Sequence, residues 1–244
     1  MKPIDQLVPL AFRPSGPVDD QTGAAATAAA IERAARFQRD IADRARKAGA
    51  ERAATPGLWL GAECGVPPRI CADLDPNFGP AAHPVAVTWT GTPWLLAVIG
   101  SRGAGKTYLG AAVLARLASA NPPEYRGTWK GLWVDCVEAL DQVRLEIGTP
   151  DDGKTIAALM RANALVLDDV GSDRIARDSS PFRAERLALI LRHRYNHLLP
   201  TVITANVASL SDITPGDARV ADRLQDCELI HLDGDSMRPQ RGDR

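Results

Sequence analysis

The sequence contains no long apolar run. A transmembrane helix needs about 20 consecutive apolar residues, and the longest candidate, Trp94 to Ile99, has only the length of a β-strand. The first residues, MKPIDQLVPLAF, also lack the apolar stretch and the small-residue cleavage site of a secretory signal. Both observations predict a cytoplasmic protein without a membrane-spanning segment.

Paired cysteine motifs are also missing. Cys64, Cys71, Cys136 and Cys227 form no CxxC pair, which argues against a disulfide framework and against a zinc ribbon. Cys64 and Cys71 with His83 are irregularly spaced and lack a fourth ligand for a tetrahedral zinc site. We therefore expect no structural zinc.

The sequence has no excess of positive charge. Its 29 Lys and Arg residues are balanced by 30 Asp and Glu residues, which gives a formal net charge of −1. Phosphate neutralisation requires clustered Lys and Arg side chains, so any contact with DNA or RNA has to come from a local patch or channel. The 45% hydrophobic and 24% charged residues are ordinary for a globular protein with one large α/β domain and a smaller appendage.

The composition divides the chain into three parts. Residues 1–55 contain a proline-bearing tail, which we predict to be flexible, and then an alanine- and arginine-rich stretch whose thin apolar stripe predicts a helix. This helix either packs weakly on its own domain or serves as a partner-binding arm, and the alanine-rich stripe favours the arm. Residues 56–93 are rich in proline and glycine and predict a linker that leads into the core, and residues 94–244 predict the main domain.

Short apolar runs alternate with helical patterns in the main domain. Strand-like runs occupy residues 94–99, 131–136, 164–169, 201–206 and 228–232. Helical patterns occupy residues 106–120, 137–147 and 181–197. This alternation predicts a parallel sheet with helices on both faces, which is a three-layer α/β fold.

The first predicted strand is followed by a phosphate-binding motif. Residues 100–107 read Gly-Ser-Arg-Gly-Ala-Gly-Lys-Thr and match G-x-x-x-x-G-K-[ST]. The glycines let backbone N–H groups surround a phosphate, and the following helix points its positive dipole end at the anion. Lys106 adds a charge to the β- and γ-phosphates of ATP, and the Thr107 hydroxyl binds Mg²⁺. The predicted ATP-binding residues are Gly100, Ser101, Arg102, Gly103, Ala104, Gly105, Lys106 and Thr107.

Polar side chains end two further strands. The run Leu165-Val166-Leu167 is followed by Asp168, which we predict to hold Mg²⁺ with Thr107, and by Asp169, which we predict to polarise the attacking water. The strand at 201–206 ends in Asn206, whose amide would lie beside the acidic pair and orient water or sense the γ-phosphate. The alternative for Asn206 is a cap on the next turn.

Several segments, taken together, resemble the DnaC and IstB branch of the AAA+ ATPases. Residues 65–69 (GVPPR) with Asn77-Phe78, Asp168-Asp169-Val170-Gly171, residues 194–206 (RYN…PTVITAN), residues 219–224 (RVADRL) and residues 234–238 (GDSMR) resemble its motifs in the family's order. The resemblance covers residues 60–240. It implies a P-loop NTPase (AAA+) core, here preceded by a helical N-terminal arm.

The resemblance also implies roles for arginines. Arg223 matches the arginine finger that reaches the nucleotide of a neighbouring subunit, and Arg238 matches a C-terminal arginine that acts like a sensor 2. Arg219 is a secondary candidate for either role. A cation supplied by another chain makes hydrolysis depend on assembly. The implied activity is therefore an assembly-dependent ATPase whose subunits self-associate through shared ATP sites. We expect it to be slow, because Asp169 replaces the longer Glu that is common in AAA+ proteins.

Three functions remain open from the sequence. The favoured one is a helicase loader that binds ATP, Mg²⁺ and single-stranded DNA and grips a replicative DNA helicase through its N-terminal arm. The second is an IstB-type helper of a transposase, which engages duplex DNA. The third is an adaptor that ATP stabilises with little turnover. The tail, arm and linker ahead of the core favour the loader.

Overall fold

A computed structural model describes residues 60–75, 83–120, 129–171, 181–213 and 218–234, and six residues nearer the amino terminus. Contacts divide the chain into two units, residues 1–44 and 45–244. The six described amino-terminal residues are all helical, namely Glu32, Ala35, Arg36, Arg39, Asp43 and Lys47. Arg36 Nη2 lies 3.1 Å from Glu32 Oε1, and both side chains are largely exposed. Five of these six residues are exposed, and all six lie within the segment that the sequence predicts as an arm.

Five strands form one parallel sheet in the order β2-β3-β4-β1-β5. Their bounds are β1 (Leu95–Gly100), β2 (Gly131–Asp135), β3 (Ala164–Val170), β4 (Thr201–Ala205) and β5 (Cys227–Leu232). Each strand lies within one residue of its predicted apolar run. The three central strands are buried along almost their whole length, which is why their sequences are continuously apolar and do not alternate.

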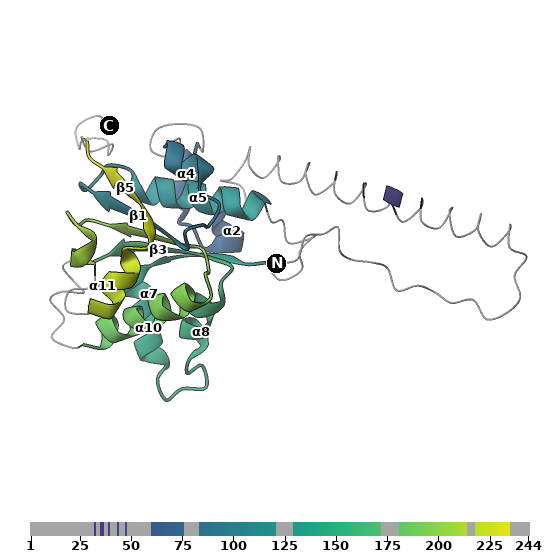
Figure 1. The fold of residues 1–244 in the computed structure, drawn as a ribbon. Coiled ribbons are helices and arrows are strands. Elements are labelled where there is room, and N and C mark those ends of the chain that lie inside the picture. Colours follow the sequence, from purple (N-terminus) through teal and green to yellow (C-terminus); the bar gives the residue numbers. More distant parts are fainter. Residues whose placement is uncertain are drawn as a thin grey trace, which may run out of the picture. The chain divides into compact units, whose positions relative to one another are not determined.

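Helices cover both faces of the sheet (Figure 1). One layer contains α2 (Leu60–Cys64), α3 (Pro68–Asp73), α4 (Pro84–Thr88) and α5 (Lys106–Ala120). The other contains α7 (Cys136–Glu146), α8 (Lys154–Arg161), α10 (Phe182–Asn196) and α11 (Ala218–Leu224), with a short 3-10 helix, η4 (Leu210–Asp212). Leu96 and Val98 of β1 pack with the first layer, and Leu95 and Ile99 pack with the second. This arrangement confirms the predicted three-layer α/β fold.

Part of the segment predicted as a linker is folded. Within residues 56–93, α2 to α4 contribute buried Leu60, Ile70 and Ala86 to the core cluster around α5. Helices α3 and α4 each have a proline in their first turn, where the missing N–H leaves no hydrogen bond unmade. Proline starts short helices here, so the linker prediction does not describe these residues.

Helix α5 lies between the sheet and these short helices. A Cβ added at Gly110 would lie 3.2 Å from Val166 Cγ1 and 3.4 Å from Thr204 Cγ2, so the glycine lets α5 approach the sheet closely. The opposite side is covered as well, since Arg116 Nη1 donates to the Ala86 carbonyl of α4 at 3.4 Å. The close approach brings the first turn of α5 near the ends of β3 and β4.

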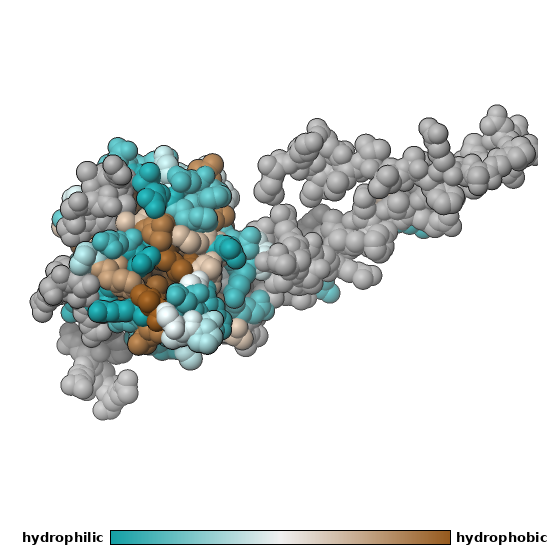
Figure 2. Space-filling view, turned by 90° about the horizontal axis from the view of Figure 1, so that it is seen from below, coloured by the Kyte–Doolittle hydropathy of each residue, from teal (hydrophilic) through white to brown (hydrophobic). Residues whose placement is uncertain are grey.

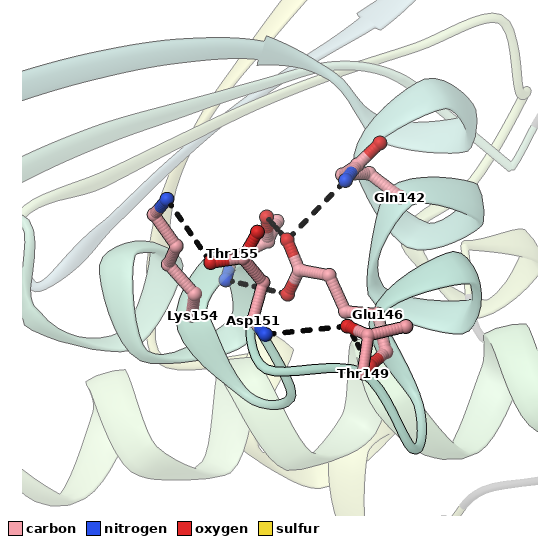
Figure 3. A network of polar contacts seen from close by, with 6 residues as sticks. All are labelled: Gln142, Glu146, Thr149, Asp151, Lys154 and Thr155. Carbon is pink, nitrogen blue, oxygen red and sulfur yellow. Dashed lines mark hydrogen bonds and ion pairs between the residues drawn. The ribbon is translucent and has the colours of Figure 1, made fainter.

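A buried carboxylate joins α7 to α8 (Figure 3). Helix α8 begins after Gly153, which has no side chain to cap the free N–H groups of the first turn. Glu146, at the end of α7, takes this role: Oε2 accepts from Thr155 N at 2.9 Å, and Oε1 accepts from Thr155 Oγ1 at 2.5 Å. These hydrogen bonds lower the pKa of Glu146.

The second helical layer carries apolar surface. Figure 2 looks at this face and shows apolar residues near its centre, with polar residues around them. Leu145 and Ile147, at the end of α7, are 72% and 54% exposed.

Among the helices in the described part of the chain, none has both the length and the apolar character that crossing a membrane requires.

Candidate functional site: a nucleotide-binding edge of the sheet

The loop of residues 100–107 joins β1 to α5 at the carboxyl edge of the sheet. Gly100 has φ 129°, and a Cβ there would lie 2.1 Å from the Leu232 carbonyl oxygen, so no other residue fits between β1 and β5. Gly103 and Gly105 both have φ 90°, a conformation that residues with a Cβ rarely adopt. The glycines of the motif are therefore required by the backbone of this loop.

Ser101 and Lys106 hold the loop in its curved shape. The Ser101 N–H donates to the Leu232 carbonyl at 3.1 Å, and its hydroxyl donates to the Gly234 carbonyl at 3.1 Å. Lys106 is 6% exposed, and its Nζ donates to the carbonyls of Gly100 at 2.9 Å and Ser101 at 2.6 Å. The ammonium group thus lies within the loop, at the amino end of α5, where an anion is stabilised by the helix dipole.

Thr107 and Asp168 face each other beside this loop. The Thr107 hydroxyl donates to both carboxylate oxygens of Asp168, at 3.0 and 3.1 Å. A hydroxyl and a carboxylate are hard oxygen ligands, which Mg²⁺ prefers and commonly combines with substrate phosphates. The residues present therefore fit a Mg²⁺ ion that accompanies a nucleotide in the loop.

The acidic pair lies in a bulge of β3. Leu167 pairs with Ile203 and Val170 pairs with Ala205, so that Asp168 and Asp169 together oppose the single residue Thr204. Two residues opposite one define a β-bulge, which changes the direction of side chains near the end of a strand. The Thr204 hydroxyl donates to Asp168 Oδ1 at 2.5 Å and accepts from Asp169 N at 3.0 Å. Thr204 therefore supports both acidic residues.

Asp169 and Asn206 form a second polar pair at the same edge. Asp169 has φ 56°, in the left-handed region that Asp adopts more readily than most residues. Asn206 follows β4, and its Nδ2 donates to Asp169 Oδ1 at 2.5 Å. The amide fixes one carboxylate oxygen and leaves the other able to accept a hydrogen bond from water, as a general base requires.

Burial raises the pKa of Asp168. Its side chain is 6% exposed, and desolvation raises the pKa of the carboxyl group above its ordinary value. The hydrogen bonds from Thr204 and Thr107 act in the opposite direction, and the negative charges of Asp169 and Asp135 raise the pKa further. A cation at this position would offset the unfavourable burial of the carboxylate.

Arg223 lies away from this edge. Its guanidinium carbon is 5.4 Å from the centroid of the Tyr195 ring, and Tyr195 packs edge-on against Trp94, with ring centroids 5.6 Å apart. Trp94 precedes β1, so Arg223 lies at the amino edge of the sheet, whereas Gly100 ends β1 at the carboxyl edge. At about 3.3 Å per residue, β1 separates the two edges by roughly 17 Å. The structure therefore does not bring Arg223 to the nucleotide-binding edge of its own chain.

The other two arginines are not placed. Arg238 lies outside the described residues, and so does the side chain of Arg219, whose backbone belongs to α11. Arg102 lies in the phosphate loop with an exposed side chain. The roles predicted for Arg238, Arg219 and Arg102 stay predictions.

Thr204 and Tyr195 are candidate functional residues that the sequence reasoning missed. Thr204 belongs to a continuously apolar strand, and its polar contacts are made with residues 35 and 36 positions away. The signal in the sequence is a hydroxyl near the end of β4, two residues before Asn206. Tyr195 carries no signal in the sequence beyond its place in the family motif of residues 194–206.

The sheet order, the phosphate loop after β1 and the acidic pair at the end of β3 define a nucleotide-binding P-loop ATPase domain of the AAA+ type. Residues 81–243 match the family described as IstB-like ATP binding protein, and the chain belongs to this family. The resemblance to the DnaC and IstB branch, predicted from the motifs, is thereby confirmed. A comparison with curated proteins gave no match.

Two solved structures with a TM-score of 0.50 share the fold. A protein assigned to the primosome, from Streptococcus pyogenes serotype M3, is 22% identical with a TM-score of 0.50 over 72% of this chain and 93% of that chain. AMPPCP-bound DnaA from Aquifex aeolicus is 15% identical with a TM-score of 0.50 over 67% and 52%. The DnaC helicase loader is 24% identical with a TM-score of 0.48 over 61% and 84%.

Proposed function

We propose that this protein is an ATP-dependent loader of a replicative DNA helicase. It binds ATP and Mg²⁺, contacts single-stranded DNA, and delivers the helicase during replication initiation. The observation that carries the ATPase part is the pairing of Thr107 with Asp168 and of Asn206 with Asp169 beside the phosphate loop. Hydrolysis is slow and depends on assembly.

Each residue of the site has a distinct role in this proposal. Residues 100–107 bind the phosphates, with Lys106 as the cation of the loop. Thr107 and Asp168 hold Mg²⁺, which neutralises charge on the phosphate oxygens when it is bound. Asp169 accepts a proton from the attacking water, and Asn206 orients the Asp169 carboxylate. Asp168→Asn should therefore weaken Mg²⁺-dependent ATP binding.

Arg223 completes the site of a neighbouring subunit. Its distance from its own phosphate loop favours action on another chain, because a guanidinium at the amino edge of the sheet does not reach a nucleotide at the carboxyl edge. An arginine supplied by another chain makes hydrolysis depend on assembly. Arg238 is the proposed sensor of the nucleotide within its own subunit.

The loader and the transposase helper differ in their partners. The family description fits either function, since it names only an IstB-like ATP binding protein. The arginine-rich segment within residues 1–55 and the exposed helical residues in it favour a partner-binding arm. We therefore favour the loader and keep the transposase helper as the alternative.

Deletion of residues 1–55 tests the loader proposal. The shortened protein should lose binding to the replicative helicase of the same source, because the arm carries the contact. It should keep its ATP affinity, because all proposed nucleotide-binding residues follow residue 55. Pull-down with the helicase and calorimetry with ATP measure the two properties, and Lys106→Ala in the full chain is the control that loses ATP affinity.

Three results would contradict the loader proposal or one part of it. Helicase binding that survives the deletion would move the contact out of the arm. Capture of a transposase together with stronger binding to duplex than to single-stranded DNA would establish the alternative. ATP hydrolysis that remains undetectable with single-stranded DNA would favour an adaptor that uses ATP only for stability.

A further inference from the structure

The guanidinium of Arg223 lies over the face of an aromatic ring. Its carbon is 5.4 Å from the centroid of Tyr195, which is within the range of a cation–π contact. Among the residues that the structure describes, no carboxylate forms an ion pair with Arg223. A planar guanidinium over a ring keeps the N–H groups at its rim available for an anion, whereas a carboxylate partner would occupy them.

The ring itself is firmly positioned. Tyr195 packs edge-on against Trp94, which is 3% exposed. The neighbouring residue, Arg194, is completely buried. Its guanidinium donates to Thr201 Oγ1 at 2.8 Å and to three carbonyl oxygens at 2.7 to 2.9 Å, those of Leu159, Ala162 and Pro200. These hydrogen bonds fix the last turn of α10, and with it Tyr195, to α8 and β4.

The helix that carries Arg223 is also anchored, here by a side chain buried in the core. Leu224, the next residue, is 0% exposed and belongs to the core cluster that contains Trp94. Arg223 itself remains partly exposed. Its backbone is therefore fixed while its side chain lies at the surface, where the ring of Tyr195 limits the directions that this long side chain can take.

We propose that Tyr195 is a positioning residue for Arg223, whose guanidinium it holds in the orientation needed at the nucleotide of a neighbouring subunit. This inference rests on the proposed function, in which Arg223 completes the ATP site of another chain. Tyr195 does not touch the nucleotide of either subunit. It acts by keeping a flexible cation in place before two subunits meet, which reduces the loss of side-chain freedom on assembly.

Two substitutions distinguish the effect of the aromatic face of Tyr195 from the effect of the volume that its side chain fills. Tyr195→Phe keeps the aromatic face and should hydrolyse ATP within about twofold of the wild-type rate. Tyr195→Met fills the space beside Trp94 with an apolar side chain but offers no ring face. Because a misplacement of about 1 Å can lower a rate 10²-fold, Tyr195→Met should lower kcat roughly 10- to 100-fold with unchanged ATP affinity.

A mixture of two variants shows whether the loss of ATP hydrolysis in Tyr195→Met arises between subunits. Tyr195→Met has a sound phosphate loop, and Lys106→Ala has a sound Tyr195–Arg223 pair, so an equal mixture should recover part of the activity. A mixture that stays inactive, a wild-type rate for Tyr195→Met, or an equal loss in Tyr195→Phe would each overturn the inference. Loss of ATP affinity in both Tyr195→Met and Tyr195→Leu would assign Tyr195 to folding and would also overturn it.

Arg223→Ala, measured alongside, separates this inference from the proposed function. If Arg223→Ala hydrolyses ATP at the wild-type rate, the shared-site mechanism itself fails. If Arg223→Ala is inactive and Tyr195→Met is fully active, the shared site stands and only the role of Tyr195 is wrong.

Discussion

Asp168 and Asp169 are adjacent in sequence but have different surroundings. Asp168 is buried and accepts hydrogen bonds from two threonine hydroxyls. Asp169 is half-buried, has a positive φ and is held by the amide of Asn206. Both residues lie in the bulge between Leu167 and Val170, and their carboxylates bond to different partners, Thr107 and Thr204 for Asp168 and Asn206 for Asp169. One carboxylate is therefore suited to a metal ion and the other to a water molecule.

The role of Asp169 predicts a variant that binds ATP and does not hydrolyse it. Asparagine also tolerates the left-handed conformation, so Asp169→Asn should preserve the bulge and the ATP affinity. Without a proton acceptor, turnover should fall by about 10²- to 10⁴-fold. Calorimetry and steady-state hydrolysis measure the two quantities. An Asp169→Asn protein with the parent rate would show that the base lies elsewhere.

The hydrogen bond from Thr204 to Asp168 predicts how Mg²⁺-dependent ATP binding changes with pH. Its hydrogen bond opposes the effect of burial on the pKa of Asp168, so Thr204→Val should raise that pKa further. Protons compete with Mg²⁺ for the carboxylate, which is ionised only above its pKa. Mg²⁺-dependent ATP binding should therefore be lost, as the pH falls, at a higher pH in Thr204→Val than in the wild type.

Calorimetric titrations with ATP, with and without Mg²⁺, at a series of pH values below neutrality measure this difference. Thr88→Val is the matched control, since the exposed Thr88 hydroxyl donates to carbonyls of its own helix. Identical pH profiles for the wild type and Thr204→Val would contradict the role given to Thr204.

At the scale of the elements, the contact between α7 and α8 predicts a pH-dependent stability. The pKa of Glu146 is lowered, chiefly by the hydrogen bond from the Thr155 side chain. A carboxylate with a lowered folded-state pKa stabilises the fold above its unfolded value of 4.5 and loses this contribution as the pH falls through the folded-state pKa. Glu146→Gln should therefore unfold at a lower temperature than the wild type at neutral pH.

The difference between the two proteins should shrink as the pH falls below 4.5. Thermal unfolding across this range measures it. Glu138→Gln, an exposed glutamate on the same helix, is the control and should change the unfolding temperature much less. A difference between wild type and Glu146→Gln that does not depend on pH would show that packing, and not charge, matters at this position.

An element could be predicted from the sequence where its signal lies in neighbouring residues, and not where it depends on residues far away in the chain. The strands and the helices α5, α7 and α10 were predicted to within about a residue, because continuous apolar runs and helical periodicity are local patterns. Helix α8 was missed. Leu159 is its one fully buried residue, and the group that caps its start is Glu146, which belongs to another helix.

The site shows the same division. The phosphate loop and Asp168 were identified because their motifs are contiguous in sequence. The contacts of Thr204 with the acidic pair and of Arg223 with Tyr195 join residues of different strands and helices. The predicted strand ends already place Asn206 beside the acidic pair, whereas the contact of Thr204 with Asp168 follows only from the sheet order, with β4 between β3 and β1. Contacts of this kind depend on topology, which no local pattern contains.

At the scale of the whole molecule, the phosphate loop and Arg223 lie at opposite edges of one sheet. The phosphate loop follows the carboxyl end of β1, and Arg223 lies near Trp94 at its amino end. If Arg223 acts in hydrolysis, it acts on another subunit, and one subunit alone has an incomplete ATP site. Hydrolysis per subunit should therefore rise with protein concentration or with single-stranded DNA that aligns subunits.

Mixing two inactive variants tests this central claim most directly. Arg223→Ala keeps its phosphate loop, and Lys106→Ala keeps its arginine. Because arginine fingers contribute about 10³- to 10⁵-fold in rate, Arg223→Ala alone should be nearly inactive while still binding ATP. An equal mixture should regain part of the wild-type hydrolysis, since some interfaces pair an intact loop with an intact arginine. A mixture that stays inactive, together with a wild-type rate that is independent of protein concentration, would contradict the shared site.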